Sequence, residues 1–580
     1  MRVRFSLPAC FLLSIYILKY SWIQIESQLL LVLMFRVIQE STSMLTRDGI
    51  RLDADIYYPD SSEKFPILLM RQPYGRKIAS TVVYAHPIWY ASHGYIVIIQ
   101  DVRGRGTSEG EFKLFAHEIE DGIDTINWAS ELPKSTGHIG MYGFSYQGMT
   151  QLYAALSQPE ALKTICPSMI AYDLYSEWAY ENGAFCLQIN LAWAIQLSAE
   201  TARLRGDEKT FQQLYSLSRN LPLSDPFTAN PAIFQQLAAD SFYHDWLNHP
   251  YADDYWQKLS PKKKMQNVDL PMLHIGGWFD PYLRGTLNLY HDMANRSQHP
   301  QHLIIGPWAH LPWGRKVGAK DYGKEATSSI DLLQIRWFDY FLKGKDTGIF
   351  AQSPITLFEM GSNQWRHFDQ YPNHAQKTFY LTSNGLASIR DSDGKLSESP
   401  PSFSAEDILI HDPWRPVPTL GGHAAIPAGP FERSSLDCRT DILTYTSDPL
   451  EQDLTIVGDI AAEIYCTADV PSFDLCVILS EVYPDGRVYN FTQGYKRIET
   501  EEFPLKIPLQ ATCIKIAQGD CLRLSLSAAC FPAYPVNSGT GKLPFEERLI
   551  ENKIITLKIS YEVNYKSLIR VNITPMNPNF

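Results

Sequence analysis

The sequence lacks the short patterns that indicate metal, redox or nucleotide chemistry. None of its nine cysteines forms a C-x-x-C pair, which argues against a zinc site or a thioredoxin-like centre. No H-E-x-x-H segment is present, and the glycine-rich stretch at 103–110 does not have the G-x-x-x-x-G-K-[ST] spacing of a P-loop. We therefore expect neither a metal nor a cofactor.

An excess of basic charge is also missing. The 63 acidic residues outnumber the 51 basic ones, which gives a net charge of −12. Binding to phosphate groups needs a basic surface, so we expect no nucleic-acid partner. With 580 residues and 45% hydrophobic content, the chain has a normal globular composition and is too long for one core.

No apolar run is long enough for a helix that crosses a membrane. Residues 5–18 are uncharged, but a spanning helix needs about 20 apolar residues, and no small-x-small cleavage site follows. Three interpretations of this N-terminal extension (1–42) stay open. Translation starts at Met34, or residues 1–33 are a signal or membrane anchor, or they form a packed helix. The first agrees with a cytoplasmic protein that keeps its cysteines reduced, and the second with an exported or membrane-tethered one.

Between residues 43 and 352, short apolar runs alternate with helical patterns. Most runs are apolar on both faces, as buried parallel strands are. They are 51–59, 65–70, 95–100, 138–143, 162–167, 270–277 and 301–306. The helical patterns include 146–158, 282–295 and 328–344. This alternation predicts a doubly wound, mostly parallel α/β sheet.

Two regions depart from this alternation. Residues 171–264 are helix-rich and aromatic, and we interpret them as a helical cap inserted between core parts 43–170 and 265–352, because insertions after sheet strands lie at the ligand-binding edge. A separate helical domain without a functional role is the alternative. Residues 353–580 show short alternating runs between turn signals, which predicts an all-β sandwich of jelly-roll type.

One serine lies where a nucleophile would. Ser145 follows the strand-like run 138–143 and precedes a helical pattern, and Gly143 comes two residues before it. This is the strand–turn–helix context of the nucleophile elbow of α/β-hydrolases. The second glycine of that elbow comes two residues after the serine, whereas Gly148 comes three residues after Ser145. A serine in an ordinary turn is the alternative.

The partners of such a serine are found in the expected order. In α/β-hydrolases the acid and then the histidine follow the serine along the chain. Asp280 ends one later strand-like run, and His310 ends the next. Each could be a loop residue when taken singly, but together they predict a Ser145–Asp280–His310 triad at the carboxyl edge of the sheet. The N–H of Tyr146 and the phenol of Tyr74 are the candidate oxyanion donors.

The chain resembles the cocaine-esterase-like (CocE/NonD) hydrolases, which are related to Xaa-Pro dipeptidyl-peptidases and α-amino-acid ester hydrolases. The resemblance extends from about residue 43 to the C-terminus. Its motifs are RQPYGR, QDVRGRGTSEGEF, GFSYQG, IGGWFD, GPWAH, RWFDYFLKG, DPWRPVPTLGG and VYPDG. It implies that Ser145 is the nucleophile, His310 the general base and acid, and Asp280 its orienting partner. It also implies an oxyanion hole formed by Tyr74 and Tyr146. The later position of Gly148 is the family's form of the elbow.

The same resemblance raises expectations for residues around the site. The stretch that holds Asp101, Arg103 and Arg105 is a loop beside the active site in the family, where we expect these residues to form buried ion pairs. The α-amino-acid ester hydrolases grip a substrate ammonium with acidic residues, some of them directly after the triad acid, and those are missing here. The acidic residues of the first cap segment could replace them, but we interpret these as a solvated helix face. They are Asp173, Glu177 and Glu181.

The sequence therefore predicts a serine hydrolase that cleaves small-molecule esters, or less easily amides, through an acyl-enzyme. A dipeptidyl-peptidase specific for Xaa-Pro is the first alternative, although residues 1–42 cannot hold the extra N-terminal domain of those enzymes. A catalytically inactive binding protein is the second. A membrane partner is not expected, and the oligomeric state is not predicted.

Overall fold

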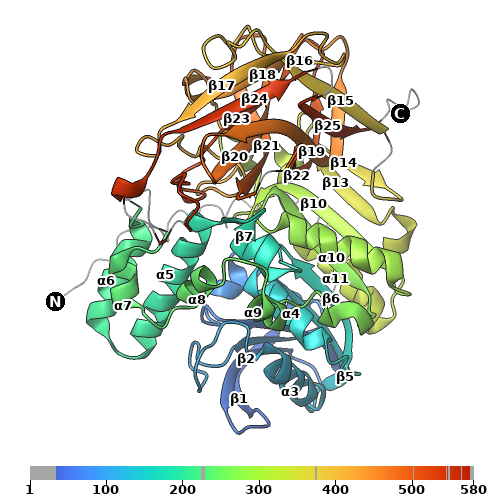
Figure 1. Ribbon diagram of the computed structural model, residues 1–580. Coiled ribbons are helices and arrows are strands. Elements are labelled where there is room, and N and C mark those ends of the chain that lie inside the picture. The colour runs from blue at the N-terminus through green and yellow to red at the C-terminus, as the bar shows by residue number, and fades with distance from the viewer. Residues whose placement is uncertain are drawn as a thin grey trace, which may run out of the picture.

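The computed structural model describes residues 34–223, 229–372, 375–500, 502–543, 545–546, 549–562 and 565–574. The interpretations of residues 1–33 lie outside the described residues, and the cytoplasmic location stays a prediction. Within the described ranges, no helix is long and apolar enough to cross a membrane. The α/β part and the cap lie below, and a β-sandwich lies above them (Figure 1).

A ten-stranded sheet is the centre of the α/β part, in the order β1-β2-β4-β3-β5-β6-β9-β10-β13-β14 (Figure 1). Its strands are β1 (Val37–Leu45), β2 (Arg51–Pro59), β3 (Phe65–Gln72), β4 (Ile96–Asp101), β5 (Ser135–Phe144), β6 (Leu162–Ser168), β9 (Met272–Phe279), β10 (Gln301–Ala309), β13 (Ile355–Glu359) and β14 (Gln364–Phe368). Neighbours from β4 to β13 run parallel. β1, β2 and β14 pair antiparallel at the two ends. The doubly wound, mostly parallel sheet is thus confirmed.

Helices cover both faces of this sheet. They are α2 (Pro87–Ser92), α3 (Glu118–Ser130), α4 (Tyr146–Ala155), α10 (Leu283–Arg296) and α11 (Ile330–Lys343). Ile67 and Leu69 on β3 belong to the core formed with α3 and α4. Leu68 and Met70 point to the opposite face and belong to the core formed with α2 and α11. This two-sided burial explains why the core strands are apolar at successive positions.

The sheet extends further along the chain than the sequence predicts. β13 pairs in parallel with β10, and β14 pairs with β13, so both strands belong to the α/β sheet although they follow residue 352. The predicted start of the sandwich at 353 is therefore too early for residues 355–368. β14 is a half-exposed edge strand, and such a strand has the same alternating pattern as a sandwich strand. The other domain boundaries stay predictions.

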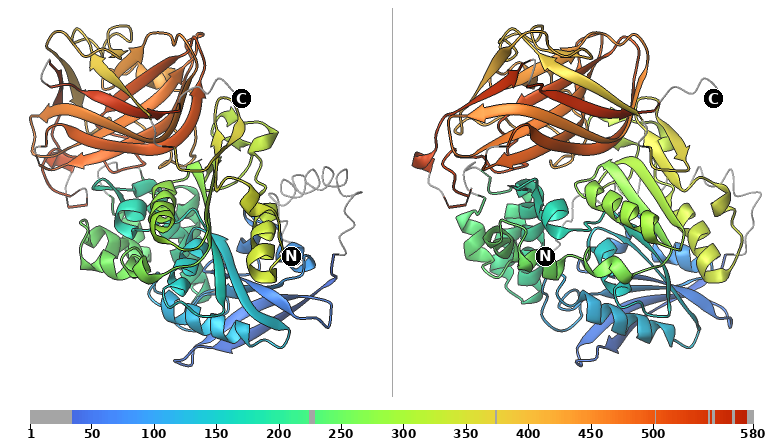
Figure 2. Two further views of the ribbon diagram at one scale, coloured as in Figure 1. Left: turned by 90° about the vertical axis from the view of Figure 1, so that its right-hand side faces the viewer. Right: turned by 45° about the vertical axis from the view of Figure 1, so that its right-hand side comes forward.

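The segment after β6 forms the helical cap. Its helices are α5 (Leu187–Leu204), α6 (Glu208–Arg219), α7 (Ala232–Leu237), α8 (Phe242–Asn248) and α9 (Asp254–Leu259). The sequence predicts no strand here, but a small hairpin of β7 (Tyr180–Glu181) and β8 (Ala184–Phe185) precedes α5. Strands of two residues are too short to produce a periodic pattern. The views in Figure 2 show the cap beside the α/β core and beneath the sandwich.

The C-terminal part is a jelly-roll sandwich of mostly antiparallel strands, drawn in colours from yellow to red in Figure 2. Its strands are β15 (Ala375–Thr382), β16 (Lys395–Ser397), β17 (Ala405–His411), β18 (Leu443–Ser447), β19 (Leu454–Ala468), β20 (Phe473–Val482), β21 (Val488–Ile498), β22 (Leu505–Ile516), β23 (Cys521–Ser527), β24 (Ile555–Tyr561) and β25 (Leu568–Ile573). β22 lies nearest the α/β core, where it contacts β9, α10 and β13. The sandwich therefore borders the region in which the predicted active site lies.

Candidate active site

Ser145 lies at the turn between β5 and α4 with an unusual backbone conformation. Its φ is 60° and its ψ is −128°, a combination that residues other than glycine rarely adopt. The amide of Ser145 donates a hydrogen bond to the carbonyl of Ser168 at 3.0 Å, which holds the turn against the end of β6. Its hydroxyl does not cap the helix. Such strain at a strand-to-helix turn is typical of a nucleophile elbow.

The two glycines of the elbow are explained by close contacts. A Cβ atom on Gly143 would lie 2.5 Å from the Cβ of Gln147. A Cβ atom on Gly148 would lie 2.3 Å from the Cγ2 of Ile170 and 2.9 Å from the carbonyl oxygen of Ser168. All three separations are shorter than the contacts that real Cβ atoms make. The late glycine therefore lets the first turn of α4 lie against the segment after β6.

Asp280 and His310 meet at the ends of neighbouring parallel strands. Asp280 follows β9, His310 follows β10, and the Nδ1 of His310 lies 2.8 Å from the Oδ1 of Asp280. Asp280 is fully buried, whereas a quarter of the His310 side chain is exposed. Burial raises the pKa of Asp280, and the hydrogen bond with His310 opposes that rise. The ring centres of His310 and Phe144 are 5.3 Å apart, so the imidazole lies beside the residue that precedes Ser145.

The loop that carries Asp280 is held by the sandwich. The side-chain amide of Gln510, on β22, donates hydrogen bonds to the carbonyls of Trp278 at 2.9 Å and Asp280 at 3.0 Å. On the neighbouring loop, the indole of Trp313 donates to the carbonyl of His310 at 3.1 Å. Gln510 could not be predicted from the sequence, because a glutamine on an alternating strand carries no local signal of its contacts.

Tyr74 follows β3 and lies beside the elbow. Its phenol oxygen accepts a hydrogen bond from the indole N–H of Trp193 at 3.1 Å. Burial raises the pKa of Tyr74 to about 12, although hydrogen bonding with Trp193 and Ser145 opposes the rise. The phenol therefore stays protonated at neutral pH and can donate a hydrogen bond.

Tyr146 is the first residue of α4, and its side chain is anchored in the core. Its ring stacks on Phe115 with centres 4.7 Å apart, and its hydroxyl donates to Glu118 at 2.7 Å. Glu118 in turn pairs with Arg71 at 2.6 Å. These contacts fix the start of the helix, where main-chain N–H groups have no partner within the helix.

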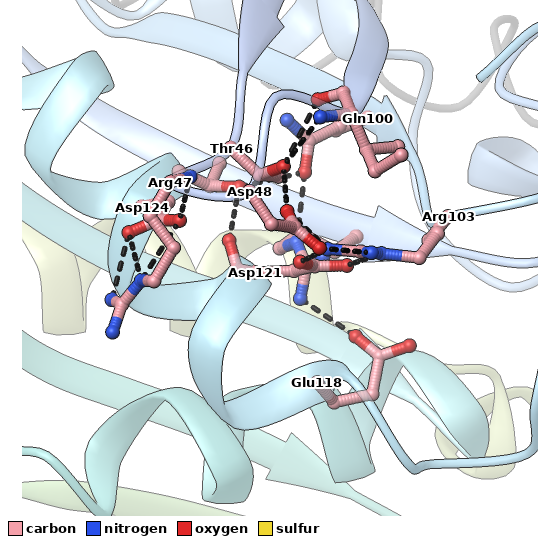
Figure 3. A network of polar contacts seen from close by, with 11 residues as sticks. Thr46, Arg47, Asp48, Gln100, Arg103, Glu118, Asp121 and Asp124 are labelled. Carbon is pink, nitrogen blue, oxygen red and sulfur yellow. Dashed lines mark hydrogen bonds and ion pairs between the residues drawn. The ribbon is translucent and has the colours of Figure 1, made fainter. Parts of the chain in front are cut away.

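Glu118 belongs to a network of polar contacts (Figure 3). Arg103 binds Asp121 and Asp48, each at 2.6 Å, while Arg47 pairs with Asp124 at 2.8 Å. The network connects the loop after β4 with α3, the helix that packs against α4. It therefore contributes to the position of Tyr146 without being in the site.

Two of the three ion-pair predictions for this loop are confirmed. Asp101 binds Arg76 at 2.5 Å, and Arg103 has the two acidic partners described above. The prediction for Arg105 is wrong. Its buried guanidinium donates to the carbonyl of Leu197 at 3.1 Å and lies over the ring of Phe112, and burial lowers its pKa to about 10. The side chain points toward the cap, where a main-chain oxygen replaces the expected carboxylate.

The acidic residues at the start of the cap are not a solvated helix face. Glu177 and Glu181 are both about 5% exposed, because their segment is a short turn and hairpin instead of a long surface helix. Glu181 accepts hydrogen bonds from His423 and Tyr534 of the sandwich and pairs with Arg284. Burial alone would raise the pKa of Glu181, but these partners lower it to about 2.

Glu177 and Asp173 form mostly local contacts. Glu177 accepts hydrogen bonds from the main-chain N–H groups of Tyr172 and Asp173, both at 2.7 Å, and from the side-chain amide of Asn288 at 2.5 Å. Asp173 accepts from two N–H groups of the turn that follows it. The predicted exposure therefore applies to neither Glu177 nor Glu181.

Aromatic rings lead from the imidazole into the cap. Tyr282 lies edge-on to His310 with ring centres 5.0 Å apart, and Trp178 packs on Tyr282 at 4.2 Å. Trp193 follows at 5.2 Å from Trp178. Next to Trp178, a cavity with room for about one water molecule is lined by charged as well as apolar side chains, among them Glu181 and Arg284. The side of the site that faces the cap thus combines aromatic rings with a small polar cavity.

Two family models match consecutive parts of the chain. Residues 48–312 match the X-Pro dipeptidyl-peptidase (S15 family), and residues 347–562 match the X-Pro dipeptidyl-peptidase C-terminal non-catalytic domain. Cocaine esterase from Rhodococcus sp. (strain MB1 Bresler) is 29% identical over 539 residues, which cover 87% of this chain and 93% of that protein. The chain belongs to the cocaine-esterase-like (CocE/NonD) hydrolase family. It is a serine hydrolase.

Solved structures show the same fold as this family member. An aminopeptidase from the marine sediment archaeon Thaumarchaeota archaeon superposes with a TM-score of 0.76 at 22% identity. An α-amino acid ester hydrolase superposes with a TM-score of 0.75 at 21% identity. Each comparison covers 93% of this chain and 97% of the other. The α/β-hydrolase core, cap and sandwich are therefore the common architecture.

Proposed function

We propose that this CocE/NonD hydrolase cleaves carboxylic esters with Ser145 as nucleophile, His310 as general base and acid, and Asp280 as its orienting partner. The observation that carries the proposal is the pairing of buried Asp280 with His310 at 2.8 Å, beside a serine with φ 60° at a strand-to-helix turn. The three groups come from the ends of three strands of one sheet, which is the arrangement that acyl transfer requires.

In the first half-reaction, the Oγ of Ser145 attacks the ester carbonyl and loses its proton to His310. The Nδ1 of His310 is bound to Asp280, so Nε2 is the nitrogen that takes the proton. Asp280 then stabilises the imidazolium. The carbonyl oxygen becomes an oxyanion, and the phenol of Tyr74 and the N–H of Tyr146 donate hydrogen bonds to it.

The first half-reaction ends when the tetrahedral intermediate collapses, the leaving alcohol takes the proton from His310 and the acyl-enzyme remains. In the second half-reaction, the acyl-enzyme is hydrolysed. Water then gives a proton to His310 and attacks the acyl carbonyl, and a second collapse releases the acid and returns the proton to Ser145. The rings of Tyr282, Trp178 and Trp193 favour an apolar acyl or alcohol group.

The contacts of the buried acids favour an esterase over a dipeptidyl-peptidase. A peptidase of that kind needs a carboxylate that can bind the free N-terminus of its substrate. Glu181 already binds His423, Tyr534 and Arg284, and Glu177 is bound by main-chain N–H groups. Both are therefore structural carboxylates in this proposal.

A burst assay with p-nitrophenyl acetate, run beside Gly-Pro p-nitroanilide, tests the proposal. We expect a burst and turnover on the ester only, and neither from Ser145→Ala. Turnover on the anilide would assign the enzyme to the dipeptidyl-peptidases. A folded wild-type protein that turns over neither compound would support the inactive binding protein instead.

A further inference from the structure

The phenol of Tyr74 has a second hydrogen-bond partner that belongs to the cap. The Nε1 of Trp193 lies 3.1 Å from the phenol oxygen. An indole N–H can only donate, so the phenol oxygen is the acceptor in this contact. The hydroxyl hydrogen of Tyr74 must therefore point elsewhere, and Ser145 lies close enough to the phenol to influence its pKa.

The cap helix that carries Trp193 is fixed to the core on the same face. Trp193 lies on α5, and Leu197 lies one turn later. The carbonyl of Leu197 accepts a hydrogen bond from Arg105, in the loop after β4. The indole is also packed between rings, with the centre of Phe242 at 5.0 Å and that of Trp178 at 5.2 Å. These contacts leave the indole N–H directed at Tyr74.

We propose that Trp193 is a positioning residue of the oxyanion hole, which orients the Tyr74 hydroxyl for donation by occupying its acceptor side. Without the indole N–H, the phenol oxygen is free to accept a hydrogen bond from the Ser145 hydroxyl. That contact would turn both groups away from their catalytic roles. With the indole N–H in place, the phenol hydrogen is directed toward the oxyanion that forms above Ser145. The inference rests on the proposed function and makes the oxyanion hole dependent on the cap.

A double-mutant cycle separates this role from simple packing. Trp193→Phe keeps an aromatic ring but removes the N–H, and Tyr74→Phe removes the phenol hydroxyl. Loss of one oxyanion donor lowers kcat by about 10²–10³-fold, so we expect about that loss for Y74F with p-nitrophenyl acetate. For W193F we expect kcat about tenfold lower and KM within about twofold, because only part of that stabilisation is lost. In the Y74F background, W193F should have no further effect.

The outcomes distinguish the inference from the function on which it rests. Trp128→Phe on α3 is the control for the loss of an indole remote from the site, and it should leave kcat unchanged. If W193F lowers kcat equally with and without Tyr74, Trp193 acts through packing and the inference is wrong. The same holds if W193F is neutral while Y74F is impaired. If Ser145→Ala and Y74F both keep full activity, the proposed function itself fails.

Discussion

The side-chain amide of Gln510 donates a hydrogen bond to the main-chain carbonyl of Asp280 at 3.0 Å. Gln510 belongs to the sandwich, whereas Asp280 belongs to the α/β core. The loop that carries the proposed triad acid is thus fixed by two parts of the chain at once. A sandwich that contacts this loop in this way contributes to the geometry of the candidate site.

Replacing Gln510 by leucine should lower both stability and activity. The change leaves the buried carbonyls of Trp278 and Asp280 without this donor, and each loss costs about 1–3 kcal/mol in the free energy of unfolding. We also expect kcat to fall, because Asp280 is the proposed orienting partner of His310. Urea unfolding and ester kinetics measure the two effects. Gln518→Leu, at an exposed glutamine of the sandwich, should change neither, and an active Q510L would contradict the role of this contact.

Two substitutions of Ser145 should distinguish the effect of backbone strain on stability from the effect of the hydroxyl group on catalysis. Ser145→Ala and Ser145→Gly both remove the nucleophile, so kcat should fall by about 10⁴-fold or more in each. Glycine adopts positive φ without steric cost, so S145G should be more stable than S145A by about 1 kcal/mol. Thermal unfolding of the two variants makes the comparison. Activity within about tenfold of wild type in either variant would refute the nucleophile assignment.

The substitution Gly148→Ala, which adds one methyl group, should disrupt the elbow. The new Cβ atom would lie 2.3 Å from the Cγ2 of Ile170, so either α4 or the segment after β6 must shift. We expect a loss of about 1–3 kcal/mol in the free energy of unfolding and a lower kcat. Gly314→Ala is the matched control, since nothing lies within 4 Å of a Cβ atom there. Equal stability of the two variants would contradict the packing argument.

Stability should decrease in mildly acidic solution. Burial lowers the pKa of His274 and of His411 to about 4, whereas an unfolded histidine has a pKa of about 6.5. The folded state therefore binds fewer protons than the unfolded state between these values. The contribution of these two histidines to the free energy of unfolding is fully present above pH 6.5. It falls as the pH approaches 4, by up to about 1.4 kcal/mol per pH unit for each histidine.

His411 is the position at which this pH dependence can be tested. Within the described part of the chain, neither of its ring nitrogens has a hydrogen-bond partner. His411→Leu should therefore reduce the loss of stability between pH 7 and pH 5 in urea titrations. An unchanged slope would show that other groups cause the acid sensitivity.

The elements that the sequence predicts well are those with a local pattern. The buried strands are continuous apolar runs, and the ends of β5, β9 and β10 each carry one polar residue of the required type. Because parallel strands end at the same edge of a sheet, the order of Ser145, Asp280 and His310 was enough to predict that they lie at one edge. The geometry agrees for Asp280 and His310, which form a hydrogen bond.

The contacts that were missed join residues far apart in the sequence. Arg105 points to a main-chain oxygen of the cap, and Glu181 is hydrogen-bonded by residues of the sandwich, so neither partner has a local signal. Glutamate is a residue type that usually lies at the surface, and only tertiary packing buries Glu181. Gln510 and Trp193 were missed for the same reason, since a hydrogen bond between separate elements depends on their final arrangement.

The burial of Glu181 also limits how halves of related enzymes can be exchanged. Its two sandwich partners, His423 and Tyr534, are 242 and 353 residues away along the chain. A chimaera that combines this α/β core and cap with another sandwich would have to supply equivalent donors at both places. Without them, the hairpin of β7 and β8 would hold a buried carboxylate that has lost part of its compensation, and a foreign sandwich that folds well by itself would still weaken the enzyme.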